Sequence, residues 1–299
     1  MDWLTDWKIP IGKSAKKAFD WLQDVGEPFF DWLSWLLEGL IDIILAVLQT
    51  PPHMPRTLED GSRDWVPLYA EDLHPLLITA LFVALTWLLQ RNWKTALLIL
   101  VGFLFILNQG YWEETTESLT LVLSAAFVCM GLGVPVGIMA AHRPRLYTWM
   151  RPVLDLMQTL PTFVYLIPAI VFFGIGMVPG LIATVIFVLP APIRLTHLGI
   201  SRTPLPLKEA AQAFGATRRQ LLWKVELPYA LPQIMTGLNQ TIMLSLSMVV
   251  IAALVGADGL GVPVVRALNT VNTALGFESG FIIVVVAIIL DRMLRVERK

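Results

Sequence analysis

Long apolar stretches without charge alternate with short polar segments along most of this chain. Residues 156–193 and 229–257 contain no Asp, Glu, Lys, Arg or His, and Cys129 is the one ionisable residue in 118–141. About 20 apolar residues in a helix span the hydrocarbon core of a bilayer. The stretch 156–193 is too long for one crossing, and the turn-forming sequence GIGMVPG at 174–180 divides it. This pattern predicts an all-α integral membrane protein.

The apolar stretches predict seven membrane-spanning helices. They lie at about 74–90, 95–110, 117–141, 161–175, 180–198, 229–254 and 276–292. Short loops rich in Lys and Arg face the cytoplasm, and these residues are concentrated in alternate loops, above all in 199–228, and in the C-terminal tail 294–299. We therefore expect the loop and the C-terminus in the cytoplasm and the N-terminus outside.

The N-terminal tail, residues 1–73, contains an apolar segment at about 28–50 that allows two interpretations. Asp31, Glu38 and Asp42 are spaced by 7 and 4 residues, which places all three on one helical stripe. Each acid would cost about 2.5–3.5 kcal/mol at the centre of a bilayer. We expect an amphipathic helix that lies in the interface on the outer side of the membrane, with Trp32 and Trp35 in lipid. An eighth span is the alternative. A polar loop follows this helix.

Composition agrees with a membrane protein and excludes several other classes. Of the 299 residues, 56% are hydrophobic and 15% charged, and the net charge is −1, so nothing indicates a nucleic-acid partner. The single cysteine, Cys129, lies in an apolar run, and the four histidines have no ligand-like spacing. We therefore expect no metal site.

The loop 199–228 has a pattern that a passive connector does not need. EAAQAF, which begins at Glu209, is a run of helix formers that ends at Gly215, a residue that tolerates left-handed backbone angles. ATRRQLLWKVE predicts a second helix, which Pro228 should end. We name Glu209–Pro228 the elbow, and its shape suits a pocket on another protein.

The elbow resembles the EAA signature of the permease subunits of ABC importers. Glu-Ala-Ala, three residues, Gly, nine residues, an aliphatic residue, one residue and Leu-Pro occur in order, with Val225 where Ile is more common. The resemblance implies a type I (MetI-like) transmembrane domain in 74–293, and a coupling loop that binds a separate ATPase. The residues it assigns to this contact are Glu209, Ala210, Ala211, Gly215, Ala216, Arg218, Arg219, Val225, Leu227 and Pro228.

Further segments resemble the permease of glycine betaine, proline betaine and choline importers. They are 154–180, 189–200 and 239–261, and GADGLGVPVVRALNTVN is similar to the choline-uptake branch. The resemblance implies a bacterial inner-membrane complex of two permease copies, two ATPase subunits and an external binding protein for a quaternary ammonium compound. ATP and Mg²⁺ would be used by the ATPase, and we expect no cofactor on this chain, which lacks a G-x-x-x-x-G-K-[ST] phosphate loop.

Two other classes remain as alternatives. The leading one is a secondary, ion-coupled carrier, but the long uncharged stretches lack the buried acid or lysine that such carriers use. A membrane-embedded enzyme is the other, and no cluster of catalytic residue types is found at membrane depth.

Few residues in the apolar stretches are candidates for the transport pathway. Asn239, Gln240, Thr241 and Ser245 place polar groups in the sixth span, where they either line a pathway or bond to neighbouring helices. Phe163 and Tyr165 could offer a ring face to a quaternary ammonium group. Gly133 and Gly137 form a GxxxG pair, which favours close helix packing.

Overall fold

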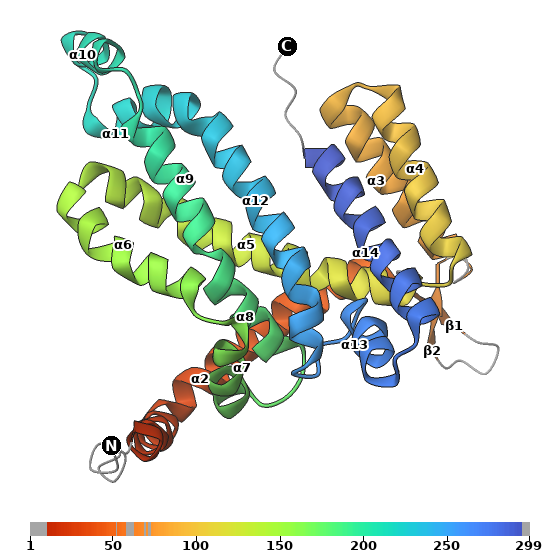
Figure 1. Cartoon of the computed structure of the whole chain (residues 1–299). Coiled ribbons are helices and arrows are strands. Elements are labelled where there is room, and N and C mark those ends of the chain that lie inside the picture. Colours follow the sequence, from red (N-terminus) through yellow and green to blue (C-terminus); the bar gives the residue numbers. More distant parts are fainter. Residues whose placement is uncertain (1–10, 52, 58–62, 69, 71–72, 295–299) are drawn as a thin grey trace.

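The computed structural model describes residues 11–51, 53–57, 63–68, 70 and 73–294. These residues form a bundle of helices with one antiparallel β-hairpin at its side (Figure 1). The elements are α2 (Ile11–Gln49), β1 (His53–Thr57), β2 (Arg63–Pro67), α3 (His74–Gln90), α4 (Trp93–Asn108), α5 (Trp112–His142), α6 (Pro144–Thr159), α7 (Thr162–Phe173), α8 (Met177–Val188), α9 (Pro190–Ser201), α10 (Leu205–Ala213), α11 (Arg218–Leu221), the π-helical turn η2 (Leu222–Glu226), α12 (Leu227–Ala253), α13 (Gly261–Thr270) and α14 (Thr273–Leu294). The predicted helical class is confirmed, and the hairpin lies where a polar loop was expected.

Helix α5 forms the centre of the bundle, and α2, α8, α9 and α12 all pack on it. Its buried positions, among them Leu121, Cys129 and Ala140, lie along most of its length. Gly133 lies so close to α9 that an added Cβ would be 2.8 Å from Cγ of Pro192. The GxxxG pair of α5 therefore serves close helix packing, as predicted.

Four apolar helical segments in the described residues are long enough to cross a bilayer: Trp112–His142, Met177–Ser201, Arg218–Ala253 and Thr273–Leu294. They coincide with four of the predicted spans. The first two predicted spans correspond to the shorter apolar helices α3 and α4, which pack on each other and on α14. The turn predicted at 174–180 is present as well, since Gly174 and Gly176 have φ angles of +77° and +144° between α7 and α8.

The predicted span at 161–175 requires correction. Helix α7 has 12 residues, which is about 18 Å of helix, too short for a hydrocarbon core of about 30 Å. It follows α6 after a 95° bend, so the two together form a broken span or a re-entrant loop. The bend falls at Leu160, whose backbone is extended because Pro161 disfavours helical angles in the residue before it.

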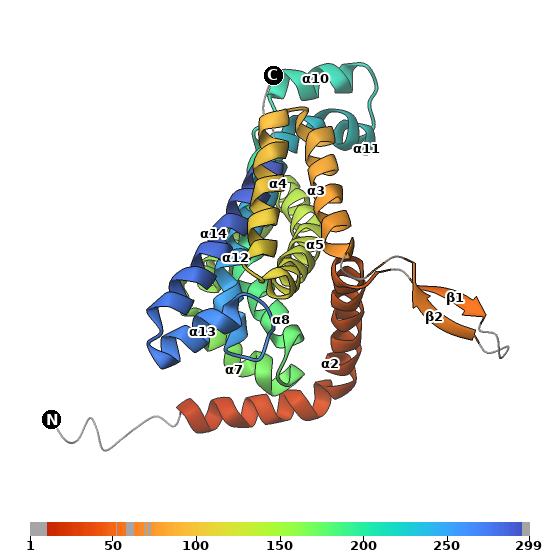
Figure 2. The ribbon, with the colours of Figure 1, turned by 90° about the vertical axis from the view of Figure 1, so that its right-hand side faces the viewer.

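Helix α2 is longer than the predicted helix at 28–50. Figure 2 shows that it bends: a first limb lies across the lower end of the bundle, and a second limb rises beside α5. Pro28 lies inside the helix, and proline is a common cause of such bends. Leu37, Ile41 and Leu48 of the second limb are buried, whereas Asp31, Glu38 and Asp42 are exposed.

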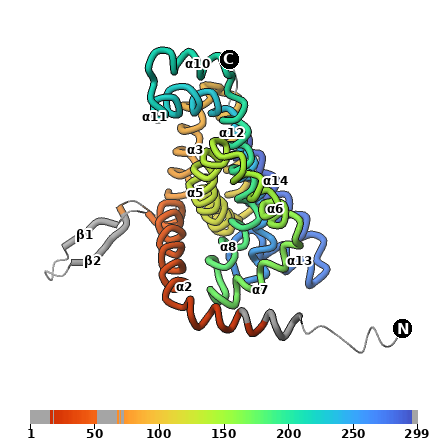
Figure 3. Tube along the Cα trace, turned by 90° about the vertical axis from the view of Figure 1, so that its left-hand side faces the viewer, coloured from red at the N-terminus to blue at the C-terminus, as the bar shows by residue number. Residues whose placement is uncertain are grey.

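The bundle has two distinct ends. Figures 1 and 3 place α10 and α11 at the upper end, and α7, α13 and the first limb of α2 at the lower end. The helix α14 runs from the lower end to the upper end. The predicted basic tail 294–299 lies, apart from Leu294, outside the described residues.

Candidate functional site

The elbow has the predicted helix–glycine–helix form at the upper end of the bundle. Its first helix, α10, begins at Leu205 and ends at Ala213. Gly215 then has a φ of +79°, and the N–H of Ala216 donates to the carbonyl of Ala211 at 3.0 Å. An added Cβ at Gly215 would meet nothing within 4 Å. Glycine is therefore required there by the backbone angle and not by space.

The second helix of the elbow starts with a capping box. The Thr217 hydroxyl accepts from the N–H of Gln220 at 3.3 Å, and the Gln220 side chain accepts from the N–H of Thr217 at 2.9 Å. These reciprocal bonds satisfy two backbone donors that a helix start leaves free. The turn and the cap together fix the direction of α11 relative to α10.

Pro228 does not end this helix, which corrects the prediction. The helix is continuous from Arg218 to Ala253, and Leu222–Glu226 forms a π-helical turn just before the proline. Proline has no N–H and its ring clashes with the carbonyl four residues earlier. A wider turn relieves this conflict. The elbow is thus continuous with α12 through the π-helical turn.

Most of the predicted coupling residues are accessible. Six of them are exposed: Glu209, Ala210, Gly215, Arg218, Arg219 and Pro228. The other four are half-buried: Ala211, Ala216, Val225 and Leu227. Beside them the elbow exposes large apolar side chains, with Phe214 at 94% and Trp223 at 62%. Side chains of this kind on an exposed helical projection suit contact with another protein.

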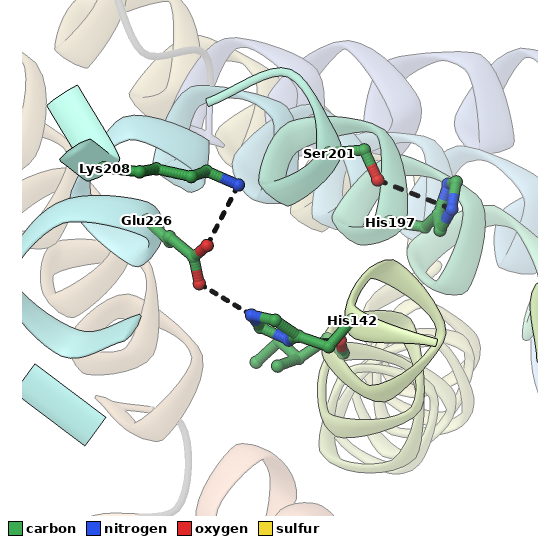
Figure 4. A network of polar contacts seen from close by, with 6 residues as sticks. His142, His197, Ser201, Lys208 and Glu226 are labelled. Carbon is green, nitrogen blue, oxygen red and sulfur yellow. Dashed lines mark hydrogen bonds and ion pairs between the residues drawn. The ribbon is translucent and has the colours of Figure 1, made fainter. Parts of the chain in front are cut away.

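One residue of the elbow has a role that the sequence analysis missed. The Glu226 side chain is only 3% exposed, and its carboxylate lies 3.0 Å from Nζ of Lys208 and 2.8 Å from Nε2 of His142 (Figure 4). Lys208 belongs to α10 and His142 is the last residue of α5. A single acid in VELP, next to a long uncharged stretch, was the signal that a partner was needed.

The four predicted pathway residues of α12 differ in their burial and in their hydrogen-bond partners. The hydroxyls of Thr241 and Ser245 are buried and donate to carbonyls of their own helix, each at 2.8 Å. Asn239 donates to a carboxylate oxygen of Asp291 on α14 at 3.2 Å. Gln240 is exposed. Of the four, Gln240 is the one that presents its side chain to the outside of the isolated chain.

The two aromatic candidates lie in different surroundings. Phe163 is 56% exposed, whereas Tyr165 is buried. The Tyr165 hydroxyl donates to the carbonyl of Met157 across the bend between α6 and α7. On the neighbouring face of the bend, Arg194 of α9 forms an ion pair with Asp155 of α6 at 2.6 Å. In the described part of the chain, no cluster of three His, Cys, Asp or Glu side chains could hold a metal ion.

Comparison with known proteins identifies the family. Residues 133–296 match the model of the binding-protein-dependent transport system inner membrane component. This segment contains the elbow and the helices from α6 to α14. The chain belongs to this family, and it is a multi-pass membrane protein that acts as a permease subunit with a separate ATPase and a substrate-binding protein.

Relatives extend the likeness over nearly the whole chain. The glycine betaine transport system permease protein OpuAB of Bacillus subtilis is 42% identical over 96% of this chain and 93% of its own length. The glycine betaine/carnitine transport permease protein GbuB of Listeria monocytogenes is 42% identical over 95% and 94%. The glycine betaine/proline betaine permease protein ProW of Escherichia coli is 40% identical over 98% and 81%.

A solved structure gives the fold. The inward-facing methionine ABC transporter MetNI matches with a TM-score of 0.53 and 24% identity, over 60% of this chain and 91% of the matched chain. This likeness shows the MetI-like permease fold and nothing about the substrate. The predicted fold class and the predicted kind of protein, an ABC importer permease, are therefore confirmed.

Proposed function

We propose that this permease takes up a small quaternary ammonium compound, with glycine betaine ahead of choline, and that a separate subunit supplies the energy from ATP. The observation that most supports this function is the elbow, a capped helical projection with a glycine turn. The chain that carries it is 40–42% identical to glycine betaine permeases. The similarity of the segment GADGLGVPVVRALNTVN to the choline-uptake branch favoured choline as substrate. The three relatives named above carry glycine betaine in their names and none carries choline, so we place glycine betaine first.

The elbow is the contact with the ATPase in this proposal. The exposed Glu209 can meet a basic side chain, and the exposed Phe214 and Trp223 supply apolar area. Because the second helix of the elbow is continuous with α12, a displacement of the elbow is passed directly into the bundle. Two ATPase copies, each using ATP and Mg²⁺, bind to two permease copies.

The upper end of the bundle faces the cytoplasm in this proposal. The Lys and Arg residues of the upper end include Arg91, Lys94, Arg202, Lys208, Arg218, Arg219, Lys224 and Arg292. At the lower end Arg266 lies in α13, and Lys13, Lys16 and Lys17 lie in the first limb of α2, which is not a short loop between spans. Positively charged short loops face the cytoplasm. The protein then lies in a bacterial inner membrane, with the N-terminal tail 1–73 outside and the residues after Leu294 in the cytoplasm. The first limb of α2 lies in the outer interface, whereas the second limb, which carries most of the segment 28–50 expected there, rises beside α5.

One face of α12 supports a second copy of the permease. Gln233, Thr236, Gln240 and Ser247 follow one another at helical spacing, and the last three are exposed. Polar side chains at membrane depth normally face other helices or a water-filled space. A two-fold axis along this face would place it against its own copy, and a glutamine amide is both donor and acceptor. The pathway would then follow the seam, with Phe163 and Tyr165 at its side.

Reconstitution tests this function against the main alternative. The permease with its ATPase and binding protein, in vesicles, should take up labelled glycine betaine when ATP is inside, whether or not the membrane potential is collapsed. An ion-coupled carrier would show the opposite dependence. Excess choline should compete more weakly than excess glycine betaine. Uptake that ignores both compounds would contradict the substrate.

A further inference from the structure

Three separate helical elements meet at the carboxylate of Glu226. The residue ends the π-helical turn η2, Lys208 lies in the middle of α10, and His142 ends α5. The two carboxylate oxygens are divided between them, with Oε1 at 3.0 Å from Lys208 and Oε2 at 2.8 Å from His142. Figure 4 shows the two ion pairs on opposite sides of the one carboxylate. A buried charge with both oxygens bonded is a fixed point in the structure.

His142 is held at both ring nitrogens. Its Nδ1 lies 3.0 Å from the carbonyl oxygen of Ile138, which only accepts, so Nδ1 donates within α5. Its Nε2 lies 2.8 Å from the carboxylate of Glu226. The ring therefore joins the last turn of α5 to the root of the elbow in a fixed orientation.

The link through Glu226 is significant because α10 has little other attachment. The helix has no buried residue, and its main packing partners are η2 and α11, which belong to the elbow itself. Lys208–Glu226 ties α10 to the root of the elbow, and Glu226–His142 ties that root to α5, the central helix of the bundle. A push on α10 therefore has a direct route to α5 besides the one into α12.

We propose that Glu226 is a positioning residue for energy coupling, which holds α10 through Lys208 and the end of α5 through His142. The inference rests on the proposed function of the elbow as the ATPase contact. It adds that α5 moves with the elbow through this link. Other charged groups nearby do not replace it: Arg143 and Arg145 follow His142 in the chain, and Arg194 is paired with Asp155.

The test uses the complete transporter in vesicles and compares uptake per ATP hydrolysed. Glu226→Gln keeps the size but removes the charge, and Lys208→Met and His142→Leu each remove one partner. We expect this ratio to fall about tenfold in Glu226→Gln, since a charge-assisted bond typically accounts for a factor of that order, while the ATPase remains bound. Lys208→Met added to Glu226→Gln should cause little further loss. Arg202→Gln, in the same loop and exposed, should behave as wild type.

A conservative variant separates this role from a purely structural one. In His142→Gln the side-chain amide can still donate to Glu226, so its ratio should stay closer to wild type than that of His142→Leu, which has no donor. Arg202→Gln should again behave as wild type.

The outcomes are distinguishable. If Glu226→Gln does not assemble, Lys208→Met and His142→Leu decide the question, because these side chains are 24% and 47% exposed and their loss is better tolerated. Wild-type ratios in both variants would overturn the proposal. A wild-type protein without ATP-dependent uptake would instead contradict the proposed function of the elbow.

Discussion

Gly137 of α5 lies directly against Thr196 of α9: a Cβ added at Gly137 would be 2.7 Å from Cβ of Thr196 and 2.8 Å from the carbonyl oxygen of Ile193. The second of these contacts is with backbone, which cannot rotate away. The two helices approach so closely because Gly137 has no side chain to stand between them. Small residues permit such approach in membrane helices, where packing is a main source of association.

Gly137→Ala should therefore destabilise the permease. Overpacking a close contact typically costs about 1–3 kcal/mol, which should appear as a lower thermal unfolding midpoint in detergent. Gly131→Ala is the matched control, because an added Cβ there meets nothing within 4 Å. Alanine is about 1 kcal/mol better than glycine in a helix, so this control should be neutral or stabilising. Equal midpoints for the two variants would contradict the packing argument.

The elbow predicts a graded series at Gly215. Its φ of +79° and the open space around it mean that backbone strain is the whole penalty in this chain. Gly215→Ala should cost roughly 1–2 kcal/mol in the geometry of the turn, and Gly215→Asn less, since asparagine tolerates left-handed angles. ATPase retained on the purified permease should follow the order Gly, Asn, Ala. Arg202→Ala should retain as much ATPase as wild type.

Glu209→Ala tests the contact itself. The carboxylate is exposed in the isolated chain, so its removal should leave membrane insertion and the unfolding midpoint unchanged. If it pairs with a basic residue in the ATPase groove, the loss of one member should weaken binding by about tenfold or more. The measurement is titration of the ATPase onto vesicles that contain the permease. Unchanged binding at low and high salt would remove Glu209 from the interface.

Sequence alone predicted the elements whose signals are local. The uncharged stretches define α5, α8–α9, α12 and α14, and Gly174, Gly176 and Gly215 mark turns that need positive φ. The bend between α6 and α7 falls where the span 161–175 was expected to begin, at Pro161. The sequence did not show that α6, before the proline, forms one bent pair with α7. The helix was expected to stop at Pro228 because proline usually ends a helix. The π-helical turn that lets the helix continue has no signal in the sequence.

The contacts of Glu226 were out of reach for a different reason. His142 lies 84 residues before it in the chain, and the pairing depends on how α5 and η2 pack. The same holds for Asn239 and Asp291, which are 52 residues apart. Long-range polar pairs of this kind require the fold, whereas sequence could indicate only that the buried acid needed a partner.

Orientation is tested with single cysteines. Cys129 is buried, and replacing it by serine provides the background. Val271 is 83% exposed between α13 and α14 at the lower end, and Thr217 is exposed in the elbow at the upper end. In intact cells an impermeant maleimide should label Val271→Cys and not Thr217→Cys, and both should react after the cells are opened. The reverse pattern would place the elbow outside.

Tyr165 separates packing from substrate binding. The ring is buried, and the hydroxyl donates to the carbonyl of Met157, so it ties α7 to α6 across their 95° bend. Tyr165→Phe removes this bond alone and should cost about 1 kcal/mol of stability, with an unchanged KM for glycine betaine. Tyr165→Ala also opens a cavity and should cost about 3–5 kcal/mol. If the ring instead offers its face to the quaternary ammonium group, Tyr165→Phe should still transport normally, but Tyr165→Leu should raise KM for glycine betaine. A role in packing alone would lower the unfolding midpoint of Tyr165→Leu and leave its KM unchanged. Phe163→Leu, at an exposed aromatic position on the same helix, gives the comparison: an increase in KM there and none at Tyr165 would assign the contact to Phe163.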